Sequence, residues 1–306
     1  MKVGIFLPQI GQAATKSNVL KVAKESENRN LDSLWVLERM LAPVNPRTPY
    51  VASPDGKLPA DYQTVFDPLD LLHFVAGQTS HVMLGTSVID MPFHNPVMLG
   101  RRFATLDVLS DGRAIAGLGL GWSKDEYEAA NVPFEKKGAR GDEFVQALKK
   151  VWTDDVVEFS GQYYKIAASK IGPKPVQKPH LPMLLGGFTP KTFERIAKYA
   201  DGWIGVAAMP LPQLEQIISG LRAAAAAAGK KTRVFLLAYP YVGEAKVPEE
   251  TRAPLTGTVQ QVGTDIEKIR EMGVEHLVLA VNAFTPFMRD ASAYVDLTAQ
   301  LAHHAR

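Results

Sequence analysis

The sequence predicts an α/β fold, a (β/α)8 barrel formed as one domain by residues 1–306. Eight short apolar segments of strand type recur along the chain, and each is followed by a stretch with helical character. No change of composition marks a linker, and strands that alternate with helices in this way are typical of a parallel barrel. A length of 306 residues lies within the range in which an α/β barrel forms a single domain.

The eight predicted strands begin three residues from the start of the chain. They are residues 3–7, 31–37, 82–89, 114–118, 182–186, 202–206, 233–239 and 276–281. Helices are predicted at residues 16–29, 67–79, 97–109 and 287–304, and within the helix-rich span 124–152. The alanine run at 223–228 has strong helix propensity, so we assign it to a helix rather than to disorder.

Two segments interrupt the alternation and are predicted to be insertions. Residues 40–66 are rich in proline, tyrosine and glycine and have no periodicity, which indicates a long loop. Residues 154–170 contain alternating apolar side chains around Ser160 and Gly161, which predicts a small hairpin.

The amino-acid composition excludes several kinds of binding partner and site. The net charge is +2 with no basic run, so nucleic acid is not an expected partner, and an apolar content of 46% with 22% charged residues suggests neither disorder nor a membrane protein. The chain has no cysteine, which excludes disulfides and thiolate metal sites. The first strand is ended by Pro8 before a signal peptide could accumulate, so we expect a cytoplasmic protein that binds small molecules.

Active sites of parallel barrels lie at the carboxyl ends of the strands, so candidate residues are sought there. Glu38 and Arg39 end the second strand, where they either pair with each other as a surface salt bridge or point at a ligand. His94 lies on the loop after the third strand, where it is either a proton donor or a locally hydrogen-bonded side chain at a helix entry. The histidines show no metal-ligand spacing, so no metal site is predicted.

Glycine-rich segments follow the fourth and fifth predicted strands. Gly186, Gly187, Phe188 and Thr189 lie between a strand and a helix, where free amides and the helix dipole favour a phosphate. The alternative is a tight turn in which Thr189 only caps the helix. Residues 117–122 bring the backbone of Leu120, Gly121 and Trp122 to the same edge of the barrel, where glycines allow close approach to a ligand.

Nine segments stand in collinear order along almost the whole chain: LWVLER (34–39), LGTSV (84–88), HNPV (94–97), ATLDVLSDGR (104–113), GLGLGW (117–122), GDEF (141–144), PKPVQKP (173–179), GG (186–187) and ADGW (200–203). In this order they resemble the bacterial luciferase-like superfamily. The resemblance is greatest to the branch that uses the deazaflavin coenzyme F420.

This resemblance implies a luciferase-like barrel with an isoalloxazine-type ring at its mouth. It implies a non-proline cis peptide in the third strand, between Ser87 and Val88, as a bulge behind the ring. The cofactor phosphate is expected on the glycine loop, and homodimers are expected through helices near the second and third strands. The residues expected to bind the cofactor are Glu38, Thr86, Ser87, Val88, Leu120, Gly121, Trp122, Gly186, Gly187, Phe188 and Thr189.

The catalytic candidates are Glu38, Arg39 and His94. Arg39 would offer a fixed positive charge to a developing oxyanion, and Glu38 would hydrogen-bond the ring or orient Arg39. Tyr50, Tyr62 and Phe66 in the long loop would wall a substrate and exclude water. In the resembling sugar-phosphate and alcohol dehydrogenases, a catalytic histidine stands at the place of Arg39 and a glutamate at that of Trp122, so reductases and monooxygenases are nearer models.

Three functions therefore stay open. The first is hydride transfer between coenzyme F420 and a small organic substrate at the barrel mouth. The second is an FMN-dependent monooxygenase that uses reduced FMN and oxygen. The third is a cofactor-binding barrel without catalysis.

Overall fold

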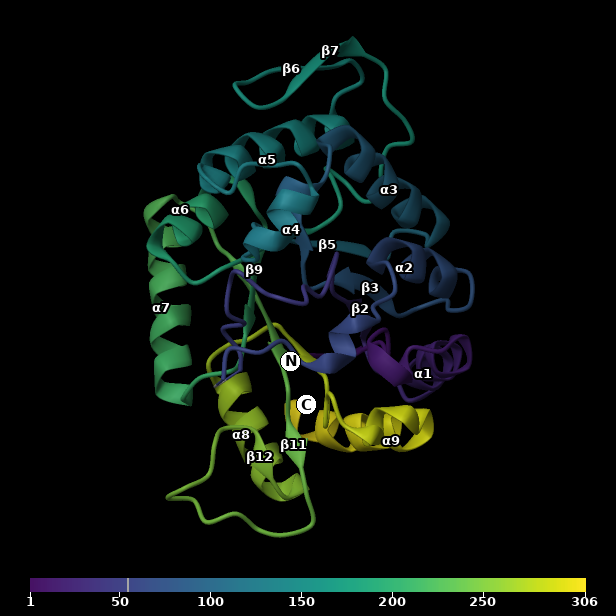
Figure 1. Cartoon of the computed structure of the whole chain (residues 1–306), viewed down its shortest axis with the longest axis vertical. Helices are drawn as coiled ribbons and strands as arrows, with labels where there is room; N and C mark the ends of the chain where they lie inside the picture. Colours follow the sequence, from purple (N-terminus) through teal and green to yellow (C-terminus); the bar gives the residue numbers. More distant parts are fainter. Residues whose placement is uncertain (54) are drawn as a thin grey trace.

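In the computed structural model, which describes residues 1–53 and 55–306, eight parallel strands close into a barrel, as predicted (Figure 1). Neighbouring strands pair in chain order, and β13 closes the barrel by pairing with both β1 and β10. The barrel strands are β1 (Lys2–Phe6), β2 (Ser33–Val36), β3 (Met83–Thr86), β5 (Ala114–Gly119), β8 (Met183–Gly186), β9 (Gly202–Val206), β10 (Arg233–Ala238) and β13 (His276–Leu279).

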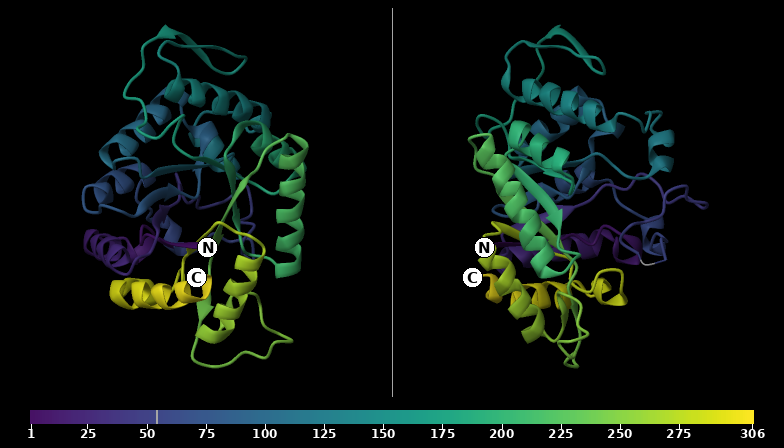
Figure 2. Two further views of the ribbon diagram at one scale, coloured as in Figure 1. Left: turned by 180° about the vertical axis from the view of Figure 1, so that it is seen from behind. Right: turned by 90° about the vertical axis from the view of Figure 1, so that its left-hand side faces the viewer.

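Helices cover the outside of the barrel and bury their apolar sides against it (Figure 2). They are α1 (Lys16–Asn28), α2 (Pro68–Ala76), α3 (Pro96–Leu109), α5 (Lys137–Thr153), α6 (Pro190–Tyr199), α7 (Leu211–Ala227), α8 (Val259–Glu271) and α9 (Ala291–Ala302). Asn95 begins α3 by accepting the Val97 amide at 2.9 Å, and the alanine run continues α7 to Ala227. Most predicted boundaries are displaced by one to three residues, because helix and strand ends depend on tertiary contacts.

The predicted third strand, 82–89, is divided into two pieces. The first piece is β3, and the second is β4 (Ile89–Asp90), which pairs with the far end of β5. The cis peptide implied by the resemblance is present at the division, between Ser87 and Val88. In the gap, the Thr86 hydroxyl bridges the strands by donating to Gly117 O at 2.8 Å and accepting the Gly117 amide at 2.9 Å.

Aromatic side chains fill the interior of the barrel. Trp35 is fully buried beside Phe235 and His276, and a Cβ on Gly85 would lie 2.6 Å from its ring. The Trp35 indole donates to Ser33 Oγ at 2.6 Å, and Ser33 contacts His276 Nε2 at the same distance. Burial lowers the pKa of His276 to about 3, so this histidine is a neutral member of the core.

The two predicted insertions take different forms. Residues 154–170 contain the expected hairpin, β6 (Val157–Ser160) and β7 (Lys165–Ser169), which stands away from the body of the barrel (Figure 2). The long loop contains a short 3-10 helix, η2 (Ala60–Gln63), and folds back over the barrel mouth. Within the described residues, the helices are too short or too polar to cross a bilayer.

Candidate functional site

Glu38 follows β2 and connects two segments at the mouth of the barrel. Its Oε1 accepts a hydrogen bond from His94 Nε2 at 2.7 Å, and its Oε2 accepts the amide of Asp90 at 2.7 Å. Its own amide donates to Val88 O at 3.1 Å, so Glu38 holds the divided third strand in place. The expectation of a local hydrogen bond for His94 is wrong, because its partner lies 56 residues away in sequence.

Arg39 forms a buried ion pair with Glu126, in the short helix α4 (Lys124–Ala129). Its Nη1 lies 2.9 Å from Glu126 Oε2, and the side chains are 8% and 2% exposed. Glu126 Oε1 also accepts the amide of Met40 at 2.8 Å. The alternative of a surface salt bridge between Glu38 and Arg39 is therefore wrong, since each has its own partner from a distant segment.

The Arg39 guanidinium is held between two aromatic rings. Its Cζ lies 4.9 Å from the ring centre of Trp122 and 5.4 Å from that of Tyr62. Its Nε is buried and has no hydrogen-bond partner within the described residues. Arg39 thus combines a fixed positive charge with a spare donor at the barrel mouth.

Two ionisable residues of the site, Glu126 and Asp90, were not predicted. Ser123 caps α4 by accepting the amide of Glu126, and this Ser-x-x-Glu signature could have indicated a helix start after the glycine turn. Asp90, at the end of β4, is half-buried, and burial together with the charges of Glu38 and Glu126 raises its pKa to about 7. Burial also raises the pKa of Glu126.

The backbone at residues 119–121 lies close against this acidic group. A Cβ on Gly119 would lie 2.5 Å from Val88 Cγ2 and 2.7 Å from Asp90 Oδ1, so a side chain has no room there. The carbonyl of Gly121 accepts a hydrogen bond from Lys137 Nζ at 2.9 Å. Leu120 is held through its carbonyl, which accepts the hydroxyl of Tyr127. Close strand packing thus leaves room only for a glycine at residue 119.

The predicted phosphate loop lies between β8 and α6. Gly187 has φ +128, and Thr189 caps α6 by accepting the amide of Thr192 at 3.2 Å. The carbonyl of Gly187 is turned away and accepts the indole N–H of Trp203 at 2.8 Å. Phe188 is 42% exposed beside the same indole. Both readings of the loop are compatible with this geometry, since a capping threonine leaves the other amides of the helix start available.

A chain of aromatic rings crosses the mouth from β5 to the far side of the barrel. Tyr50 and Tyr62 of the long loop lie in it and link Trp122 to Phe284 and Tyr239 through ring-centre distances of 5.3 to 6.2 Å. Phe66 does not join them and lines a groove between α1 and α2. In residues 1–53 and 55–306, no group of three or more His, Asp or Glu side chains is placed to hold a metal ion.

The chain resembles known proteins along most of its length. Residues 1–276 match the family model of the luciferase-like monooxygenases. The chain belongs to this family. It is 35% identical over 184 residues to an uncharacterized protein of Mycobacterium tuberculosis, a match that covers 60% of this chain and 65% of that relative. The matched region therefore spans slightly less than two thirds of the length of these mycobacterial relatives.

Relatives within this family use two kinds of ring cofactor. The chain is 30% identical to an F420-dependent glucose-6-phosphate dehydrogenase of Kineococcus radiotolerans, over 78% of this chain and 69% of that one. It is 25% identical to an FMNH2-dependent dimethylsulfone monooxygenase of Pseudomonas putida, over 68% of this chain and 57% of that one. A flavin or deazaflavin is therefore a cofactor type of its relatives.

Solved structures show the same fold. The monooxygenase RslO1 from Streptomyces bottropensis superposes with a TM-score of 0.81 at 23% identity, and the match covers 100% of both chains. An F420-dependent secondary alcohol dehydrogenase, in complex with an F420-acetone adduct, superposes with a TM-score of 0.78 at 18% identity and covers 100% of this chain and 99% of that one. At these identities the likeness concerns the barrel alone.

Proposed function

We propose that the protein is an F420-dependent oxidoreductase that transfers hydride between the deazaflavin and a small organic substrate at the barrel mouth. The observation that carries the proposal is the glycine loop 186–189 at the start of α6, with the basic start of a second helix beside it. Arg195 of α6 donates to the carbonyl of Gly138 at 3.2 Å, which places the first turns of α5 next to α6. Coenzyme F420 carries a longer anionic tail than FMN, so extra cationic groups beyond the phosphate loop favour it.

The side chains at the start of α5 fit such a tail. Lys137 and Arg140 lie in its first turn and are half-buried. Arg140 Nε is buried without a hydrogen-bond partner among the described residues, and the guanidinium lies 4.7 Å from the ring centre of Tyr163. An orphaned donor of this kind is satisfied by an anionic ligand.

The ring would lie at the barrel mouth. The residues that would line it are those expected above, from Glu38 and Val88 to Leu120 and Gly121. Thr86 contributes differently, because its hydroxyl is already used by the Gly117 backbone and its side chain is buried. We therefore assign the Thr86 side chain to joining β3 and β5, and its contact with a ring would be through its backbone.

When bound, a deazaflavin would supply hydride chemistry, and the protein would supply orientation and charge. Arg39 would stabilise negative charge that develops on a substrate oxygen, because Glu126 and the two flanking rings keep its guanidinium in place. His94, hydrogen-bonded to Glu38 and partly exposed, is placed to pass a proton to or from a substrate at the mouth.

The test is a fluorescence titration of the purified protein with three ligands: coenzyme F420, its chromophore without phosphate and tail, and FMN. We expect F420 to bind at least tenfold more tightly than either of the others, because only F420 reaches both the loop and α5. Arg140→Gln should reduce the affinity for F420 and leave that for the bare chromophore unchanged. Binding of FMN alone would refute the choice of cofactor.

A second candidate is the FMN-dependent monooxygenase, which the dimethylsulfone monooxygenase relative favours. It predicts oxygen consumption when reduced FMN is supplied together with a substrate. Oxygen uptake that depends on reduced FMN and is abolished in Arg39→Met would support it over the deazaflavin enzyme.

A further inference from the structure

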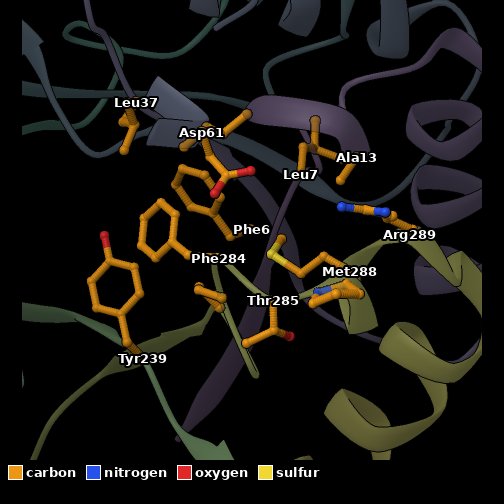
Figure 3. Close-up of a pocket in the computed structure, with 14 residues that line it drawn as sticks. Phe6, Leu7, Ala13, Leu37, Asp61, Tyr239, Phe284, Thr285, Met288 and Arg289 are labelled. Atoms are coloured by element: carbon orange, nitrogen blue, oxygen red, sulfur yellow. The ribbon is translucent and has the colours of Figure 1, made fainter. Parts of the chain in front are cut away.

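A cavity of about 80 Å³ lies at the carboxyl ends of β1 and β13, lined in part by Tyr239 and Phe284 of the aromatic chain (Figure 3). Its wall combines polar and charged groups with apolar side chains, among them Phe6, Leu7, Leu37, Ala280, Phe284 and Met288. Leu37 directly precedes Glu38, so the cavity begins one residue from the candidate site.

Tyr62 separates the cavity from Arg39. Its ring centre lies 5.4 Å from Arg39 Cζ on one side and 5.3 Å from the ring centre of Phe284 on the other. Phe284 lines the cavity, and Tyr62 is 4% exposed. A single aromatic side chain from the long loop therefore divides the two spaces.

The polar groups at the cavity carry opposite charges. Figure 3 shows the Asp61 carboxylate beside Phe6 and the Arg289 guanidinium on the other side of the cavity, near Leu7 and Met288. Neither residue forms an ion pair in the part of the chain that the structure describes. Each of these charges attracts one kind of ion and repels the other, so together they give no net preference for an anion or a cation, and the apolar part of the wall solvates neither.

The volume limits what can enter. At about 80 Å³ the cavity is roughly half the size of an engineered apolar cavity of about 150 Å³ that binds benzene, so it accepts about three or four carbon atoms. A short alkyl group fits this space, and a phosphorylated sugar does not.

We propose that this cavity binds the short apolar end of an uncharged substrate, and that Tyr62 sets the length of the end that fits. The inference rests on the proposed function, because it names the class of molecule that would react at the mouth.

The test uses the full chain without cofactor and straight-chain 2-ketones from 2-butanone to 2-octanone, with saturation-transfer-difference NMR as the readout. Affinity should rise about fourfold for each added methylene and level off once about four carbons are buried. Hexanoate and hexylammonium should bind at least tenfold more weakly than 2-hexanone. Affinity that is independent of chain length, or equal binding of either ion, would overturn the proposal.

Two variants place the ketones in the cavity. Ala283 is half-buried and lines it, so Ala283→Leu should weaken 2-hexanone binding at least tenfold. Ala224→Leu, at a half-buried position of α7, is the matched control and should bind as the wild type does. Tyr62→Ala should extend the rise in affinity to longer ketones, and if it does not fold, Ala283→Leu still decides. An Ala283→Leu protein that binds as well as the control would refute the site.

The outcome is separate from that of the cofactor titration. The ketone series contains no ring cofactor, so it can succeed in a protein that fails to bind F420. Tight binding of F420 with no dependence on ketone length would refute the cavity and leave the proposed function standing.

Discussion

Arg39 and its neighbours show how single side chains at the barrel mouth depend on one another. The guanidinium is almost fully buried and is neutralised by Glu126, which also accepts a backbone amide. Removing one member of such a pair leaves an uncompensated buried charge, which costs more than the pair itself contributes. The ion pair therefore makes the position of Arg39 sensitive to changes in α4.

Glu126→Gln should lower the free energy of unfolding by about 3 kcal/mol, because Arg39 would be left buried without a counter-ion. Urea denaturation followed by circular dichroism measures this. Glu128→Gln, in the same helix at a side chain 72% exposed, is the control and should change stability by less than about 0.5 kcal/mol. Equal effects of the two variants would contradict the role of the buried pair.

Asp90 predicts a dependence of stability on pH. Its pKa is raised from 3.8 to about 7, chiefly by burial, and then by the charges of Glu38 and Glu126. The native state therefore binds more protons than the unfolded state in this window, and stability is lost as pH rises from about 4 to 7. Asp90→Asn should remove this loss of stability. We expect the loss to be about 2 kcal/mol, because the partial exposure of Asp90 reduces the effect of its pKa shift on stability.

Thermal unfolding of wild type and Asp90→Asn at pH 4.5, 6 and 7.5 provides the measurement. The two proteins should differ most in the slope of melting temperature against pH. Parallel slopes would show that Asp90 is ionised throughout this range.

Among the elements, the loop between β8 and α6 depends on the backbone of a single residue. Gly187 has φ +128, which L-residues rarely adopt, and an added Cβ would lie 2.9 Å from Thr192 Oγ1. Thr192 lies in the first turn of α6, so the glycine allows the helix start and its free amides to approach the barrel closely. The shape of the proposed anion site follows from this contact.

Gly187→Ala should destabilise the protein by about 2 to 4 kcal/mol, from backbone strain together with the clash on Thr192. Gly229→Ala is the matched control, because Gly229 also has a positive φ, +69, but an added Cβ meets nothing within 4 Å. It should cost about 1 kcal/mol. Differential scanning calorimetry compares them, and equal melting temperatures would mean that the loop adapts to a side chain.

For the whole molecule, the closed barrel leaves one outer face unusually apolar. Met98 and Leu109 lie on α3 and are 57% and 63% exposed, and Phe74 on the adjacent α2 is 38% exposed. Met98 and Leu109 are three helical turns apart and so project from the same side of α3. Exposed apolar groups on neighbouring helices are typical of a protein interface.

We therefore predict a homodimer through α2 and α3. The double variant Met98→Lys, Leu109→Lys should be monomeric, because it places two charges at the centre of this face. Light scattering coupled to size-exclusion chromatography measures the mass. Val156→Lys, at a site 51% exposed in the segment before β6, is the control and should stay dimeric. A wild-type protein of monomeric mass would exclude the interface.

The order and type of the elements could be read from the sequence because they depend on local physics. The signals are apolar runs of strand length, the glycines Gly119, Gly121, Gly186 and Gly187, and the helix caps Asn95 and Thr189. Each of them acts through neighbouring residues. The sequence thus predicted the eight strands, the hairpin and the strand ends that form the mouth. It also placed Glu38, Arg39 and His94 at that edge.

Only the tertiary structure shows which residues Glu38, Arg39 and His94 contact. Arg39 and Glu126 are 87 residues apart in sequence, and Glu38 and His94 are 56 residues apart. Each pair is in contact because closure of the barrel brings the ends of distant strands together. The raised pKa of Asp90 and the cavity behind Tyr62 likewise result from side chains that converge from several segments. Local periodicity carries no information on such convergence, because it is set by packing in three dimensions.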